Sequence, residues 1–118
     1  MRSARDVVQF SSGRDVRAIA AGWANQHGYR LMRMSTAAVV FGKRPVPVGL
    51  PVMVELASRD SGHTLSCWGR LNRLVVTRDI SLTDPARAGR RHRHRAQGEV
   101  NELLWALGAP PLGGSDHG

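Results

Sequence analysis

The chain has 118 residues, of which 42% are hydrophobic, and its 17 basic and 9 acidic residues give a formal net charge of +8. This length fits a single domain with a core of its own, and the apolar content excludes wholesale disorder. The single cysteine, Cys67, excludes an internal disulfide, and no apolar stretch approaches the ~20 residues that a membrane-spanning helix needs. The polar first residues do not resemble a secretory signal, so we expect a cytoplasmic protein with no membrane partner.

Arginine supplies almost all of the positive charge. Sixteen of the 17 basic residues are arginine, and Lys43 is the only lysine. Because the guanidinium group forms bidentate contacts with phosphates and carboxylates, we expect a polyanionic partner.

The first predicted elements are a strand and a helix. Residues 5–11 place Val8 and Phe10 on one face of a strand. Ser12 is positioned to cap the following helix, with Asp15, three residues later, as its reciprocal partner in a capping box. One apolar stripe with helical spacing follows, made of Val16, Ile19, Ala20, Trp23, Ala24 and His27. Gly28 then stands where a left-handed helix cap is expected.

Strands are predicted through the middle of the chain. Residues 29–34 and 37–41 read as two strands joined by a turn at residues 35–36. Three prolines within residues 45–51 exclude a helix or a central strand and indicate an extended surface connection.

The clearest hairpin joins Val52–Ser58 to His63–Leu71. Residues 59–62 between them have the composition of a turn. The register that pairs Ser58 with His63 makes one face of the hairpin uniformly apolar, with Leu56 and Val54 directed to that face. The other face is mixed and carries Met53, Glu55, Thr64, Ser66, Trp68 and Arg70. A shift by one residue would mix the two faces, so we favour the first register.

The C-terminal third combines a short strand, an arginine-rich segment and a helix. Residues 74–77 are predicted to form a strand, and residues 83–85 end the sheet. Residues 86–96 show no apolar stripe, so we predict a loop or arm there. A helix is predicted from about Gln97 to Leu107, with a flexible tail over residues 109–118. The apolar stripe of this helix is Val100, Leu103, Leu104 and Leu107.

These elements predict an α+β fold, an antiparallel sheet of about five to six strands with two helices in the order β-α-β-β-β-β-β-α. Residues 1–108 form one small domain, and residues 83–96 are a basic loop or arm within it.

The arginine-rich segment is the strongest functional signal in the sequence. Residues 83–98 carry a net charge of +4, because five arginines outweigh Asp84. The predicted anion-binding or nucleic-acid-binding residues are Arg87, Arg90, Arg91, Arg93 and Arg95. Clustered arginine in an arm is typical of proteins that bind phosphate backbones without strong sequence preference. We therefore predict a non-enzymatic binding module for nucleic acid.

Tryptophans offer a second class of function, a protein-interaction or oligomerisation module. Trp68 and Arg70 lie on the mixed face of the hairpin and form a surface contact if no helix covers that face. Trp105 lies off the apolar stripe of the last helix and could anchor an acidic protein or a second copy of the chain.

Enzymatic signatures are sparse. The chain has no nucleotide-binding glycine motif, no paired cysteines and no close pair of acids, so we predict no catalytic residue and no cofactor. An enzyme of another kind would use Glu55 as a base, or Cys67 with His63. Metal binding by His92 and His94 with His63 or His117 is disfavoured, since the flanking arginines repel cations, and we predict no metal site.

Overall fold

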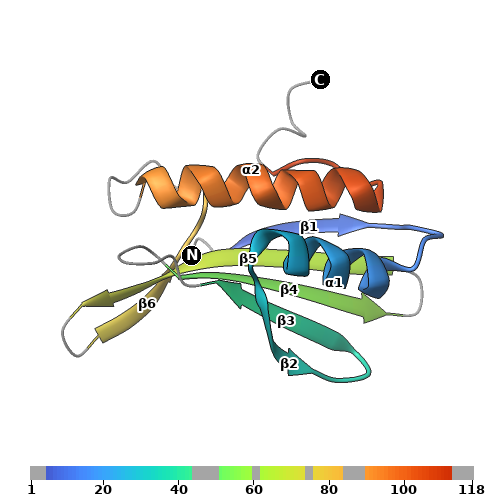
Figure 1. Cartoon of the computed structure of the whole chain (residues 1–118), viewed down its shortest axis with the longest axis horizontal. Helices are drawn as coiled ribbons and strands as arrows, with labels where there is room; N and C mark the ends of the chain where they lie inside the picture. Colours follow the sequence, from blue (N-terminus) through green and yellow to red (C-terminus); the bar gives the residue numbers. More distant parts are fainter. Residues whose placement is uncertain (1–4, 44–50, 60–61, 74–75, 84–89, 113–118) are drawn as a thin grey trace.

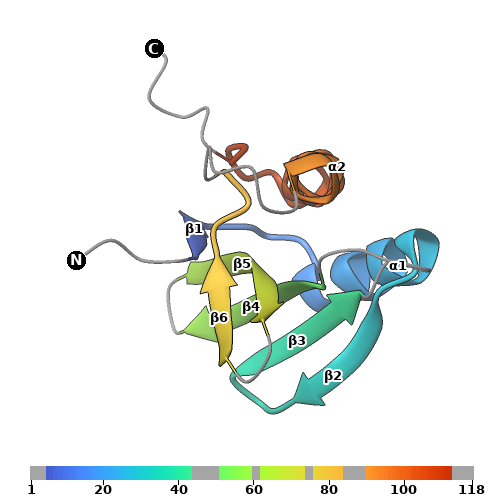
Figure 2. The same ribbon diagram turned by 90° about the vertical axis from the view of Figure 1, so that its left-hand side faces the viewer.

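Two helices cover one face of an antiparallel sheet (Figures 1 and 2). The structure, a computed structural model, describes residues 5–43, 51–59, 62–73, 76–83 and 90–112. Its elements in chain order are β1 (Asp6–Phe10), α1 (Val16–His27), β2 (Arg30–Met34), β3 (Ala38–Lys43), β4 (Val52–Arg59), β5 (Gly62–Arg73), β6 (Val76–Ile80) and α2 (Arg90–Leu107). This order confirms the predicted α+β class and the predicted sequence of elements. None of the described helices combines the length and the apolar character needed to cross a bilayer.

The sheet follows the path β1-β5-β4-β3-β2, and every pairing is antiparallel. β5 is long enough to pair with β1 over its first part and with β6 over its last part. β2 is the last strand of the path and pairs with β3 alone among the described strands.

The central hairpin has the predicted register. Ser58 pairs with His63, Leu56 with Leu65 and Val54 with Cys67. The uniformly apolar face lies under the helices. Its four central side chains are at most 1% exposed: Val54, Leu56, Leu65 and Cys67. The hydrophobic alternation therefore fixes which face of the sheet the helices cover.

Helix α1 confirms the predicted stripe but begins later than Ser12 indicated. Val16, Ala20, Trp23 and Ala24 are buried. The N-cap is Asp15, whose side chain accepts a hydrogen bond from the Ala18 N–H at 3.2 Å, whereas Ser12 accepts from Arg14 in the preceding turn. Gly28 is the C-cap, with a φ of 79° that a residue with a β-carbon rarely adopts.

Helix α2 begins at Arg90, so the prediction of a loop or arm is wrong for residues 90–96. The apolar stripe continues backwards from Val100 through Ala96 to Arg93, which are 3% and 1% exposed. Arg93 occupies a core position because its aliphatic stem packs while its Nη1 donates to the Ser81 carbonyl oxygen at 3.2 Å. The sequence pattern missed this turn because arginine was counted as a solvent-facing residue.

The predicted tail is packed over its first residues. Leu112 is 4% exposed and belongs to the core cluster, and its N–H donates to the Asn101 Oδ1 at 2.7 Å. Residues 109–112 are thus folded against α2, and the rest of the predicted tail lies outside the described residues. The proline-rich connection, apart from Pro51, lies outside them as well.

The burial of Arg93 yields a prediction about stability. Arg93→Ala should lower the free energy of unfolding by about 2–4 kcal/mol, since it opens a cavity and removes the donor to the Ser81 carbonyl. Arg95→Ala, two residues further along the same helix, removes an exposed arginine and should change stability by no more than about 0.5 kcal/mol. Urea unfolding of both variants measures the difference, and equal effects would show that Arg93 is not a core residue.

Candidate nucleic-acid interface

The predicted arginine cluster is divided by the fold. Arg93 is buried and so cannot contact a ligand, which corrects its predicted role. Arg95 is exposed on α2, and its side chain has no hydrogen bond or ion pair within the described part of the chain. Arg90 and Arg91 lie in the first turn of α2 with side chains outside the described part, and Arg87 lies outside the described residues altogether.

The solvent-facing surface of α2 carries an arginine and a tryptophan together. His94, Arg95, Gly98, Glu102 and Trp105 are exposed along it, while the opposite stripe is buried. Trp105 is 81% exposed, which is the highest value among the exposed large hydrophobic residues of the described chain. Ten residues separate it from Arg95, which corresponds to about 15 Å along a helix axis. This surface, from His94 to Trp105, is called here the outer face of α2.

Trp68 and Arg70 do not form the predicted contact surface. Although the two described helices, α1 and α2, lie over the other face of the sheet (Figure 1), Trp68 is only 4% exposed. The Arg5 guanidinium lies 3.7 Å from the centroid of its ring, in a cation–π arrangement. Arg70 is exposed. The correction follows from packing, because the Trp68 ring is engaged inside the molecule.

The carboxylate of Asp6 is hydrogen-bonded within the fold. It accepts hydrogen bonds from the Ser81 hydroxyl at 2.8 Å, the Leu82 N–H at 2.7 Å and the Thr83 hydroxyl at 2.6 Å. These bonds fix the chain that leaves the sheet toward α2. Charge-assisted bonds of this kind are stronger than neutral ones.

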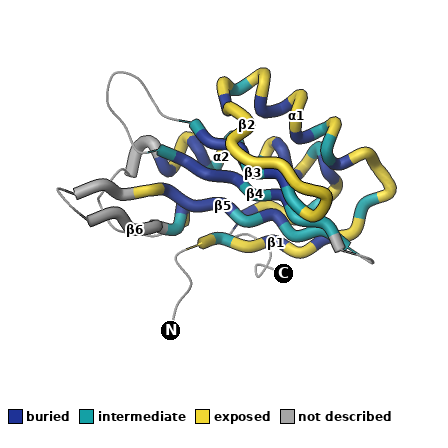
Figure 3. Tube along the Cα trace, turned by 90° about the horizontal axis from the view of Figure 1, so that it is seen from below, coloured by how far each residue is buried: buried dark blue, intermediate teal, exposed yellow. Residues whose placement is uncertain are grey.

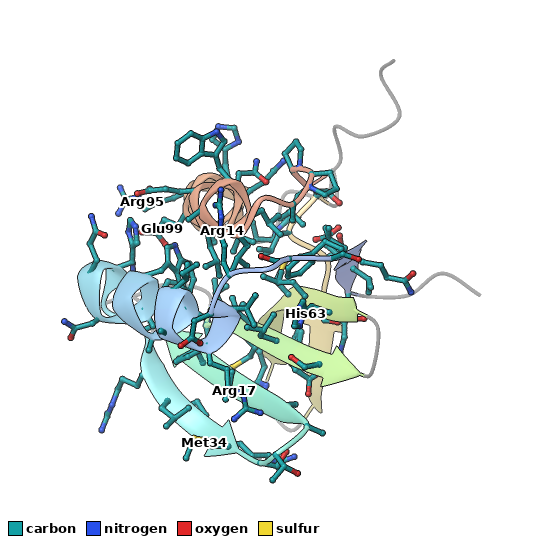
Figure 4. All side chains as sticks on the ribbon, turned by 90° about the vertical axis from the view of Figure 1, so that its right-hand side faces the viewer. Arg14, Arg17, Met34, His63, Arg95 and Glu99 are labelled. Atoms are coloured by element: carbon teal, nitrogen blue, oxygen red, sulfur yellow. The ribbon has the colours of Figure 1, made fainter. Side chains whose placement is uncertain are left out.

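Glu99, labelled on α2 in Figure 4, is a second internal acid, and its contacts join three elements. Its carboxylate accepts from the Tyr29 hydroxyl at 3.1 Å and from the Lys43 Nζ at 3.1 Å, and it lies 3.4 Å from the His27 Nδ1. The Glu99 carbonyl oxygen accepts from the Trp23 Nε1 at 2.8 Å. Its side chain is only 16% exposed. The cluster joins α1, β3 and α2, and both carboxylate oxygens of Glu99 are occupied by residues of the fold.

The sequence offered little sign of the Glu99 cluster. Glu99 stands near the start of the predicted helix from about Gln97 to Leu107, where the helix dipole alone accounts for an acid. Its partners stand 56 to 70 residues away in sequence at Lys43 and Tyr29, so no local pattern joins them. The single lysine among 17 bases was the one unusual feature at these positions.

The side chains of several arginines lie on the surface without a described partner, whereas Asp6 and Glu99 are hydrogen-bonded within the fold. Arg30, Arg33, Arg70 and Arg95 are exposed, and their side chains have no hydrogen bond or ion pair within the described residues. The resulting surface is more positive than the ratio of bases to acids alone implies.

The residues considered for catalysis fall into two groups. Cys67 is 0% exposed, and burial, with a smaller effect of the Asp6 charge, raises its pKa, so its thiol stays protonated and unreactive. Glu55 and His63 both line an open groove of about 720 Å³ on the sheet, together with Gln9, Phe10, Ser11, Ala57, Gly62, Thr64 and Ser66.

Glu55 and His63 are not arranged as an acid–base pair. Both residues line the groove, but alternation along the strands directs their side chains to opposite faces of the β4–β5 ladder, since Glu55 pairs with Ser66 and His63 pairs with Ser58. The His63 Nδ1 is 2.9 Å from the Ser58 Oγ, and the His63 ring packs at 5.3 Å from the Phe10 ring. Within the described ranges, no three His, Cys, Asp or Glu side chains converge in a way that could hold a metal ion.

A scan against models of protein families, a search of curated proteins and a search of solved structures each found no match for this chain. What the protein does is therefore inferred from its own residues.

The buried acids with raised pKa values predict alkaline destabilisation. Burial, followed by the Glu99 charge, raises the pKa of Tyr29, and burial raises that of Cys67. The folded state keeps both protons while the unfolded chain loses them near its ordinary values of about 9 and 10. Stability is therefore fully present below about pH 9 and falls above it, by up to about 1.4 kcal/mol per pH unit and per group.

Cys67→Ala isolates one of the two contributions. Its free energy of unfolding should decline less steeply than that of the unchanged protein between about pH 8.5 and 10.5. Urea unfolding at each pH measures the two slopes. Parallel slopes would contradict a thiol that stays protonated in the folded state.

Proposed function

We propose that the protein is a non-enzymatic binding module for single-stranded nucleic acid, which it binds along the outer face of α2. The observation that carries the proposal is the presence on one helix surface of Arg95, exposed and without a partner in the described part of the chain, and of Trp105, 81% exposed. Arg87, Arg90 and Arg91 belong to the proposed interface on the ground of their sequence positions.

The two side chains supply complementary interactions. Arg95 offers a guanidinium to a backbone phosphate. Trp105 offers a ring on which a base can stack, an interaction worth about 1–3 kcal/mol per base. Bases are available for stacking where they are unpaired, so this combination favours a single strand over a duplex.

The charge distribution supports a polyanionic ligand in general. Asp6 and Glu99 are occupied inside the fold, and Asp15 caps α1. Among the acids whose side chains are described, Glu55 and Glu102 remain, and Glu102 lies on the outer face of α2 itself, with its carboxylate 3.4 Å from the His27 Nε2. The net charge of +8 attracts a polyanion at long range, and this attraction weakens as salt is added.

Arg93 docks the start of α2, so Arg95 lies on a helix and not on the predicted loop or arm. Because Arg93 anchors the first turns of α2 to Ser81, Arg95 is held in place before a ligand arrives. Binding then requires less ordering of the protein than a disordered arm would.

Fluorescence anisotropy with labelled single-stranded DNA and RNA of about 15 nucleotides, and with a matched duplex, tests the proposal. Single strands should bind more tightly than the duplex. Trp105→Ala should weaken single-strand binding by about ten-fold or more. Arg95→Gln should weaken it too, and should lower the slope of log K against log salt by about 0.7 between about 50 and 300 mM salt.

Arg30→Gln is the matched control, since it removes one exposed arginine from β2 instead of α2. It should leave the affinity close to that of the unchanged protein. If Arg30→Gln and Arg95→Gln weaken binding equally and Trp105→Ala has no effect, the binding is that of a generic basic protein and the proposed interface is wrong.

A further inference from the structure

β2 is an exposed edge strand with an unusual composition. All five of its residues are exposed, and Figure 3 shows the strand exposed along its whole length. Leu31, Met32 and Met34 are 53%, 60% and 66% exposed, and they make up three of the five exposed large hydrophobic residues in the described chain. An edge strand that displays apolar side chains and unpaired backbone groups is a template for a further strand.

The two ends of β2 are held by the rest of the fold. At its start, Tyr29 is 5% exposed, and its N–H donates to the Ala24 carbonyl at 2.8 Å. At its end, the Arg17 Nη2 donates to the Ser35 carbonyl at 2.7 Å and to the Thr36 carbonyl at 2.9 Å. Figure 4 shows Arg17 beside the edge that carries Met34. The strand is thus ordered before a partner binds, which lowers the entropic cost of pairing.

The charges of the edge decide what can pair with it. Arg30 and Arg33 are exposed, and neither has a partner in the described residues. Neither β2 nor its neighbour β3 contains an acidic residue. Charged residues on an edge strand normally discourage pairing between copies. Here a second copy would bring two further arginines to the seam on a chain of net charge +8, whereas an acidic strand would be attracted.

Apolar side chains on the partner would extend the existing core. Leu31 pairs with Phe41, whose 5% exposure places it under the helices. The register of β2 shifts between Leu31 and Arg33, so Arg33 pairs with Val40 and lies on the other face. An apolar side chain beside Leu31 would continue the buried layer, while an acidic side chain on the other face would reach Arg33.

From these observations we infer that the free edge of β2 binds an extended segment of another protein, one that alternates acidic and apolar residues, as an added strand of the sheet. Backbone hydrogen bonds along the edge contribute affinity, and Arg30 and Arg33 select an acidic partner. This edge is separate from the outer face of α2, so the inference stands or falls independently of nucleic-acid binding.

Peptides of alternating sequence test the inference directly. A labelled peptide of alternating Glu and Val should bind the full chain, and the matching Lys and Val peptide should not. The double variant Arg30→Glu, Arg33→Glu should lose at least about ten-fold in affinity for the Glu-Val peptide and should gain binding of the Lys-Val peptide. The reciprocal gain shows that the variant is folded.

Two controls locate the binding. Arg95→Glu makes the same kind of charge change on α2 and should leave the affinity for the Glu-Val peptide within about two-fold. Hydrogen exchange should show new protection of the amides of Arg30–Met34 when the peptide is bound. Equal binding of both peptides, or binding without that protection, overturns the inference. A dimer joined at β2, detected by sedimentation equilibrium and cross-linking, overturns it as well.

Discussion

The docking of α2 on the sheet is the constraint on which the rest of the molecule depends. Its stripe from Ala96 to Leu107 supplies much of the core over the sheet, but two polar ties fix where the helix sits. Arg93 joins its first turns to Ser81, next to the hydrogen bonds that Asp6 makes, and Glu99 joins its middle to Tyr29 and Lys43. Burying a charged side chain costs free energy unless the side chain finds partners. Arg93 and Glu99 reach their partners only when α2 lies in this position on the sheet, so these contacts fix the position of the helix.

This arrangement separates the charges of the protein. The acids whose contacts are described serve the fold, as at Asp6, Asp15 and Glu99, whereas Arg30, Arg33, Arg70 and Arg95 face solvent. The charged groups thus stabilise the interior and leave the exterior positive. Two surfaces of different chemistry result: an arginine and a tryptophan on the outer face of α2, and arginines among apolar residues on the edge of β2. A flexible single strand suits the first surface and an extended acidic peptide suits the second.

Local patterns in the sequence predicted the fold wherever hydrophobic alternation or helical spacing was unbroken. The register that pairs Ser58 with His63 and the cap at Gly28 are both confirmed. Prediction failed for side chains that combine an apolar part with a charged or polar group. Arg93 was counted as polar although its stem packs in the core. The predicted helix therefore began at about Gln97 and not at Arg90, and residues 90–96 were predicted as a loop or arm. Trp68 was considered for a surface contact on condition that no helix covers its mixed strand face, but Arg5, distant in sequence, packs against its ring. Contacts across such distances leave no local trace in a single sequence.

Residues 90–98, the part of the arginine-rich segment that lies in α2, are the docked beginning of that helix and hold Arg95 in place. Native-state hydrogen exchange of the amides from His94 to Gln97 tests this docking most directly, with the amides of residues 100–107 in the same helix as the internal reference. If the segment is docked, the amides at 94–97 exchange far more slowly than in an unfolded chain, and in Arg93→Ala they lose protection before those of residues 100–107. Exchange at the rate of an unstructured peptide in the unchanged protein would show that the segment is a mobile arm and would contradict the account.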